Sequence, residues 1–125
     1  MNRLLKLTLL AAAPCVLASS AIAQTQANLN ETAAQQLRTA DRALNTQYTA
    51  TMNSLSAPTR LLLRDVQRTW ITFRDQQCRY EASGVRGGSV FPMIQSQCLA
   101  RLTTERTREL RRLSQCEEGD LSCPR

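Results

Sequence analysis

The sequence predicts an all-α protein, a small antiparallel three-helix bundle stapled by two disulfides. Three observations lead to this fold class. Apolar residues recur at helical spacing in three segments, prolines and glycines separate these segments, and four cysteines follow the first of them. Three helices joined by short links are expected to pack up-down-up around one core.

The N-terminus, residues 1–23, has the pattern of a secretory signal peptide. Two basic residues precede an apolar run over 7–17, and Ala21-Ile22-Ala23 predicts cleavage before Gln24. The run is shorter than the roughly 20 residues that span a bilayer, so we expect an exported protein, in the periplasm or outside the cell, with no membrane-spanning helix. Cys15 suggests lipidation as an alternative, but Pro14 stands where a lipid-attachment box has a small residue.

We expect residues 24–31 to form a flexible polar lead-in and residues 32–125 to form the folded domain. Thr32-Ala33-Ala34-Gln35 has the form of a capping box, which predicts the start of the first helix. Ser56-Ala57-Pro58 ends that helix. Pro58 suits the first turn of a second helix, because the N–H that proline lacks has no partner there.

The second helix, about Pro58 to Glu81, carries two stripes. Its apolar stripe contains Leu62, Val66, Trp70, Phe73 and Tyr80. A second stripe, roughly 100° away, contains Gln67, Ile71, Arg74 and Cys78. Two stripes allow this helix to contact two neighbours, as the middle member of a small bundle must.

A loop from Ser83 to Phe91 follows, because its three glycines would cost too much backbone entropy inside a helix. Pro92 opens the third helix, and a tight polar turn from Cys116 to Cys123 ends the chain. The predicted core takes its members from the apolar stripes of all three helices: Leu37, Leu44, Tyr48, Leu55, Leu62, Val66, Trp70, Phe73, Leu102 and Leu113.

The four cysteines beyond the leader favour disulfides in an exported chain of this size. A zinc site is the alternative, but the sequence has no histidine and no CxxC pair. Cys78 near the end of the second helix and Cys98 near the start of the third should lie at similar heights, which favours a Cys78–Cys98 bridge. Cys116 and Cys123 would then close the tail; spacing alone leaves the other connectivities open.

The net charge of the chain is a weaker indication of its partner. Removal of the leader leaves fourteen arginines against ten acidic residues, a net charge of +4. Guanidinium groups form planar contacts with carboxylates or phosphates, so an anionic partner is conceivable, although most of these arginines are expected simply to solvate helix faces. The arginines are not interleaved with aromatic residues, so we expect no nucleic-acid partner.

Polar residues on the packed faces of the helices predict a structural network of Asp41, Gln67, Arg74 and Arg106. Arg106 lies on the apolar stripe of the third helix, and Asp41 lies beside that of the first. A buried charge needs a partner, so we expect Arg106 to pair with Asp41 and the network to fix helix register, with a binding site as the alternative.

The sequence offers few candidates for catalytic residues. Without histidine the commonest general base is missing, and oxidised cysteines supply no thiolate. Asp41, Asp75 and Glu105 or Glu109 are candidates for a glycosidase-like carboxylate pair, but arginines stand beside them. We expect no catalytic residue, no metal and no cofactor.

A spaced set of residues resembles the signature of the LprI-type lysozyme-inhibitor family. It consists of Asp41, Leu44-Asn45, Tyr48, Gln67, Trp70, Arg74-Asp75, Cys78, Gly87-Gly88-Ser89, Cys98, Thr103 and Arg106. The resemblance extends from Asp41 to Leu110, and the tail from Cys116 to Pro124 also looks like an ending found in the family. It implies an all-helical exported domain with relatives that inhibit lysozyme, and hence lysozyme as the partner.

The glycine loop is the segment expected to meet that partner, through Arg86, Gly87, Gly88 and Ser89. Arg86 would enter a cleft lined by carboxylates, such as the pair about 5 Å apart in retaining glycosidases. The alternative is that the glycines only satisfy turn geometry and Ser89 caps the third helix.

Two other functions fit the sequence. An envelope-binding protein would use the arginines on anionic lipid or polysaccharide. A periplasmic docking factor would use an apolar stripe left exposed after the helices pack.

Overall fold

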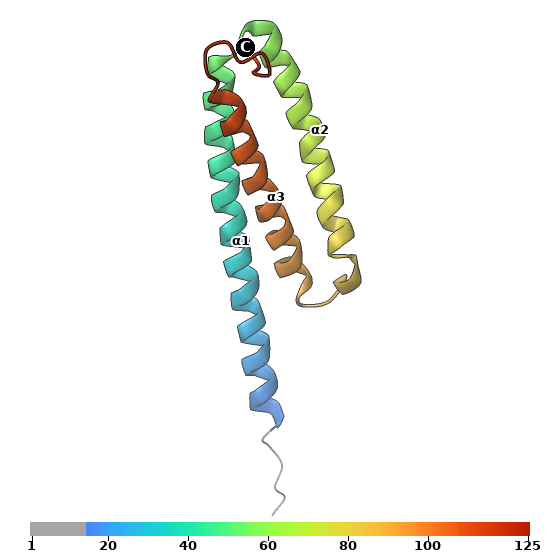
Figure 1. Ribbon diagram of the computed structural model, residues 1–125. Coiled ribbons are helices and arrows are strands. Elements are labelled where there is room, and N and C mark those ends of the chain that lie inside the picture. The colour runs from blue at the N-terminus through green and yellow to red at the C-terminus, as the bar shows by residue number, and fades with distance from the viewer. Residues whose placement is uncertain (1–14) are drawn as a thin grey trace, which may run out of the picture.

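The computed structural model describes residues 15–125. Most of the predicted signal peptide lies outside the described residues, and cleavage before Gln24 stays a prediction. Three helices follow in order: α1 (Cys15–Ser54), α2 (Ala57–Glu81) and α3 (Phe91–Ser114), with the 3₁₀ turn η1 (Ser83–Val85) between the last two. They run up, down and up, with α1 and α3 side by side and α2 beside them (Figure 1). The predicted all-α bundle is confirmed.

The expectation of a flexible lead-in over 24–31 is wrong, because this segment is part of α1. It contains no proline or glycine that would stop the helix. The Thr32 hydroxyl donates a 2.9 Å hydrogen bond to the Asn28 carbonyl of the preceding turn, so Thr32 lies inside the helix and is not its cap. The Asn30 side chain donates a 2.9 Å bond to the Ser89 carbonyl, which ties this segment to the loop before α3.

The tightest packing in the bundle joins α1 to α3. The buried residues of these two helices are mostly small or branched: Ala33, Ala40, Leu44 and Thr51 in α1, and Cys98, Thr103, Thr107 and Leu110 in α3. Small side chains let two helix backbones approach closely. Thr107 donates its hydroxyl to the Thr103 carbonyl at 2.9 Å, so this buried polar group is satisfied within its own helix.

The predicted core is wrong for α2. Leu62, Val66 and Phe73 are exposed, as is Tyr80 on the same stripe, whereas Gln67 and Cys78 of the other stripe are buried. The helix therefore turns its polar stripe toward α3. Of the other predicted core residues, Leu44 and Leu55 are buried, and five are half-buried: Leu37, Tyr48, Trp70, Leu102 and Leu113.

Two disulfides staple the chain, with the predicted connectivity. Cys78 of α2 bridges Cys98 of α3 across a Cα–Cα distance of 5.6 Å. Cys116 bridges Cys123 across 5.9 Å and closes the tail. The tail returns to the turn between α1 and α2 (Figure 1), where the Ser56 hydroxyl donates a 2.9 Å hydrogen bond to the Arg125 carbonyl.

Candidate functional site

The centre of the bundle is built around Trp70 of α2 and two arginines. The guanidinium carbon of Arg74 lies 5.3 Å from the centroid of the indole ring, and that of Arg106 from α3 lies 5.9 Å away. Both distances are within cation–π range, and the low exposure of Arg106, at 7%, strengthens that attraction. The three residues connect α2 to α3.

Arg74 joins all three helices. Its Nη1 donates to Asp41 Oδ1 of α1 at 3.2 Å and to Thr103 Oγ1 of α3 at 3.1 Å, while its Nε donates to Asp75 Oδ1 at 3.0 Å. The planar guanidinium has donors in fixed directions, which suits it to three acceptors from separate helices. Asp41 is therefore paired with Arg74, and the expected pairing of Asp41 with Arg106 is wrong.

Arg106 serves a second set of partners. Its Nε donates to Gln67 Oε1 of α2 at 3.0 Å, and its Nη1 donates to Glu109 Oε2 at 2.6 Å. The four residues of the predicted network thus lie in one region but form two contact sets. Arg74 and Asp41 belong to one set, Arg106 and Gln67 belong to the other, and the two sets meet at Trp70. Asp41 pairs with Arg74 and not with Arg106, because Arg74 lies one turn along α2 from Trp70 and already occupies the carboxylate.

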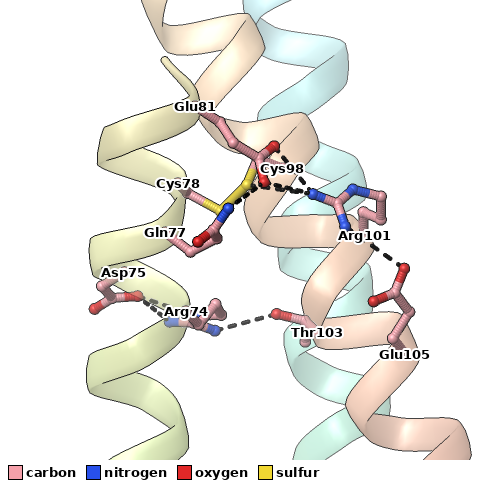
Figure 2. Close-up of a disulfide and its surroundings, with 9 residues drawn as sticks. All are labelled: Arg74, Asp75, Gln77, Cys78, Glu81, Cys98, Arg101, Thr103 and Glu105. Atoms are coloured by element: carbon pink, nitrogen blue, oxygen red, sulfur yellow. Dashed lines mark hydrogen bonds and ion pairs between the residues drawn. A yellow bond between two sulfur atoms is a disulfide. The ribbon is translucent and has the colours of Figure 1, made fainter. Parts of the chain in front are cut away.

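The Cys78–Cys98 bridge joins the C-terminal end of α2 to the N-terminal part of α3, and an ion pair lies next to it (Figure 2). Arg101 Nη2 donates to both carboxylate oxygens of Glu81, at 2.9 and 3.0 Å. Gln77 Nε2 donates to the same carboxylate at 3.0 Å. The hydrogen bond from Gln77, followed by that from Arg101, holds the pKa of Glu81 below its usual value of 4.5.

The loop between α2 and α3 projects from this anchored end. Arg86 is exposed, and within the described residues its side chain makes no hydrogen bond or ion pair. Gly87 has φ +80°, a left-handed conformation that glycine adopts without a Cβ clash. The next residue, Gly88, approaches the Val85 carbonyl so closely that a Cβ would lie 3.2 Å from it. The turn therefore requires a glycine at Gly87 and favours one at Gly88.

Ser89 does not cap α3, contrary to the alternative considered for it. The helix begins at Phe91 after Val90, and no side chain caps its N-terminus. The carbonyl of Ser89 instead accepts the hydrogen bond from Asn30 of α1. The loop is thus held by α1 on one side and by the Cys78–Cys98 bridge behind it.

An open groove of 420 Å³ between α1 and α2 was missed in the sequence. Asp41, Asn45 and Tyr48 of α1 line one side, and Arg64 and Arg68 of α2 line the other. Arg64 and Arg68, two arginines one helical turn apart, are the signal that could have pointed to it. The groove offers guanidinium, amide and phenol groups, which suit an anionic or hydroxyl-bearing ligand.

The candidate carboxylates for a glycosidase-like pair are each engaged by an arginine. Arg74 binds Asp41 and Asp75, Arg101 lies 3.6 Å from Glu105, and Arg106 binds Glu109. Across residues 15–125, no group of three or more potential metal-ligating side chains comes together.

These features define the class: an all-helical, disulfide-stapled domain whose polar centre joins helices and whose loop and grooves face outward. The chain belongs to the lysozyme inhibitor LprI family, whose family model matches residues 17–110. An uncharacterized protein of Rhizobium meliloti (strain 1021) is 38% identical over 110 residues, which cover 78% of this chain and 79% of the relative. No solved structure matches the chain significantly.

The family match agrees with the resemblance found in the sequence and extends it toward the N-terminus, to residue 17. The part of α1 upstream of Asp41 is therefore included in the family pattern. Over the part of the chain that the structure describes, no helix combines the length and the apolar character needed to cross a bilayer.

Proposed function

We propose that this protein is exported and inhibits a lysozyme by placing the loop from Val85 to Phe91 in the cleft of the enzyme. The observation that carries the proposal is the exposed Arg86 beside two glycines, on a loop held at both ends. Family membership supports lysozyme as the partner class.

The chemistry of Arg86 suits a cleft that contains carboxylates. A guanidinium forms two parallel hydrogen bonds with a carboxylate, and lysozyme presents two carboxyl groups about 5 Å apart. Gly87 and Gly88 have no side chains to keep the loop away from the cleft walls. The inhibitor would thus place a charge where the enzyme has the opposite charge, without itself carrying out a reaction.

Anchoring of the loop lowers the entropy lost on binding. The Cys78–Cys98 bridge fixes its two flanking helices, and the Asn30 bond to Ser89 fixes it against α1. A segment already held in its bound shape loses less freedom when it meets a partner. Asn30 lies after the expected cleavage point, so the contact of the loop with α1 belongs to the mature protein.

Long-range electrostatics would not assist binding to a basic lysozyme, because the mature chain itself carries a net charge of +4. Affinity must then come from local complementarity at the loop. An acidic lysozyme would meet the same loop with favourable attraction at a distance as well.

The test is a cell-wall lysis assay of the mature protein, residues 24–125, against several lysozyme types. Arg86→Ala should weaken inhibition about thirtyfold or more, since truncating one partner of a desolvated charge pair costs about 2 kcal/mol or more. Its melting temperature should stay within about one degree of wild type, because the side chain holds no other residue.

Arg112→Ala is the matched control, an exposed arginine near the other end of α3, and it should inhibit like wild type. Failure of the wild-type protein to inhibit any lysozyme type at stoichiometric excess would contradict the function. Equal inhibition by wild type and Arg86→Ala would keep the function and reject the loop as its contact.

A further inference from the structure

The exposed stripe of α2 has a regular repeat. Leu62, Val66, Phe73 and Tyr80 are 66, 53, 53 and 75% exposed and lie on one face of the helix. With Thr69 and Gln76 they alternate at spacings of four and three residues from position 62 to position 80. This is the spacing of the contact positions between paired helices, which pack as knobs into holes.

Charges flank this stripe on one side only. Asp65 and Arg79 each stand one residue before a contact position, Val66 and Tyr80, and so share one edge of the stripe. Both are exposed, and neither forms an ion pair with another described residue. One end of the edge is therefore negative and the other positive.

We propose that α2 is the interface of a homodimer in which the α2 helices of two copies pair antiparallel through this stripe. In that arrangement Leu62 faces Tyr80 of the second copy, Thr69 faces Phe73, and each contact occurs twice. The same register brings Asp65 near Arg79 of the second copy, again twice. In a parallel arrangement Asp65 would instead lie level with Asp65 of the second copy, and Arg79 level with Arg79. Neither Asp65–Arg79 pair would then form.

A hollow beside the stripe fits the proposed occupant. It has a volume of 340 Å³, lies between the end of α1, α2, α3 and the tail, and is lined chiefly by apolar residues, among them Leu62, Leu63, Val66, Leu113 and Pro124. In the antiparallel register, Tyr80 of the second copy lies opposite Leu62, at the mouth of this hollow. Tyr80 is the most exposed of the four apolar residues of the stripe, and an aromatic ring has a large apolar surface to bury.

A single helix pair forms a small interface, so the dimer is expected to be weak and concentration-dependent. The measurement is sedimentation velocity of the mature protein over a concentration series from about 1 μM to about 0.5 mM, which spans the affinities of such contacts. The average mass should rise from that of a monomer toward that of a dimer.

Two adjacent leucines give a matched pair of variants. Leu62→Ser removes a contact residue and should weaken dimerisation about tenfold or more. Leu61→Ser is the control: Leu61 is 56% exposed on the same helix but lies off the stripe, so this variant should dimerise like wild type. Circular dichroism of both at low concentration checks that the helices remain intact.

A charge exchange tests the orientation. Asp65→Arg and Arg79→Asp should each weaken the dimer, because each sets like charges together, whereas the double variant should recover most of the wild-type affinity. A mass that stays monomeric at every concentration would overturn the proposal. Equal effects of Leu62→Ser and Leu61→Ser, or no recovery in the double variant, would reject this interface.

The dimer proposal does not depend on lysozyme inhibition. The stripe and the Arg86 loop use different residues, so Leu62→Ser should inhibit lysozyme as wild type does if both proposals hold. A loss of dimer with inhibition retained separates the two surfaces.

Discussion

The two faces of α3 show two ways of holding helices together. Toward α1 it packs closely through small and branched side chains, and Thr107 and Leu110 are 5% and 1% exposed. Toward α2 it packs through a disulfide, two arginines, a glutamine and the Trp70 ring, while the apolar stripe of α2 faces outward, with Leu62, Val66, Phe73 and Tyr80 exposed. The first interface is stabilised by burial and close packing, and the second by covalent and polar contacts.

This difference shows that an amphipathic helix does not always bury its apolar stripe. The apolar stripe of α2 is as regular as that of any core helix, yet its neighbours cover the polar stripe. A surplus apolar face on a small protein marks a surface for association. The contrast therefore predicts that equally apolar residues will respond very differently to truncation.

The largest expected effect comes from Leu110→Ala. Its side chain is enclosed at the α1–α3 interface, so truncation should cost about 2–5 kcal/mol of unfolding free energy through lost burial and the cavity left behind. Phe73→Ala removes a larger side chain from α2 but should change stability by no more than about 0.5 kcal/mol. Urea denaturation at low protein concentration, where self-association adds nothing, compares the two.

A cost for Phe73→Ala that approaches that of Leu110→Ala would mean that the stripe is buried within the monomer. The contrast between the two interfaces of α3 would then be false.

The orientation of α2 shows what the sequence could and could not predict. Helical spacing, Pro58 and the glycine loop are local signals, and they predicted the three helices and their order. Which stripe of α2 faces α3 is a tertiary question. Cys78 lies on the polar stripe, so its bridge to Cys98 rotates that stripe toward α3 and the apolar stripe away from it. Combining the expected disulfide with the helical spacing would have predicted this rotation.

The polar centre was predicted as a set but not as pairs. Burial required partners for Asp41, Gln67, Arg74 and Arg106, and helical spacing brought them to similar heights. The choice of partner depends on side-chain reach: Arg74 extends to Asp41, and Arg106 to Gln67. The α1–α2 groove was missed because it forms where two helices diverge, which no single helix reveals.

An intermediate effect is expected at the polar interface. Arg106→Ala leaves the buried Gln67 without its donor and removes a cation from Trp70, which should cost about 1–3 kcal/mol. Arg112→Ala, an exposed arginine on the same helix, should stay within about 0.5 kcal/mol of wild type. Thermal and urea unfolding of both variants measure the difference.

If Arg106→Ala proves as mild as Arg112→Ala, the polar contacts between α2 and α3 contribute little. The Cys78–Cys98 bridge would then be the main restraint on α2.

The smallest effect is a pH dependence at the lower end of the same interface. Hydrogen bonds from Gln77 and then Arg101 lower the pKa of Glu81 in the folded protein, so the ionised carboxylate stabilises the fold above the unfolded pKa of 4.5, and this contribution is lost as pH falls through the folded value. Glu81→Gln should therefore be less stable than wild type at pH 7, and the difference should shrink as the pH falls through the folded pKa, below which wild-type Glu81 is also neutral. Because Glu81 is exposed and solvent screens its ion pair, the difference should be small at every pH.

Arg101→Ala should reduce this pH dependence without abolishing it, since Gln77 still donates to Glu81. Urea unfolding of the three proteins from neutral to acidic pH makes the comparison, and a gap between wild type and Glu81→Gln that does not change with pH would show that the carboxylate does not link α2 to α3.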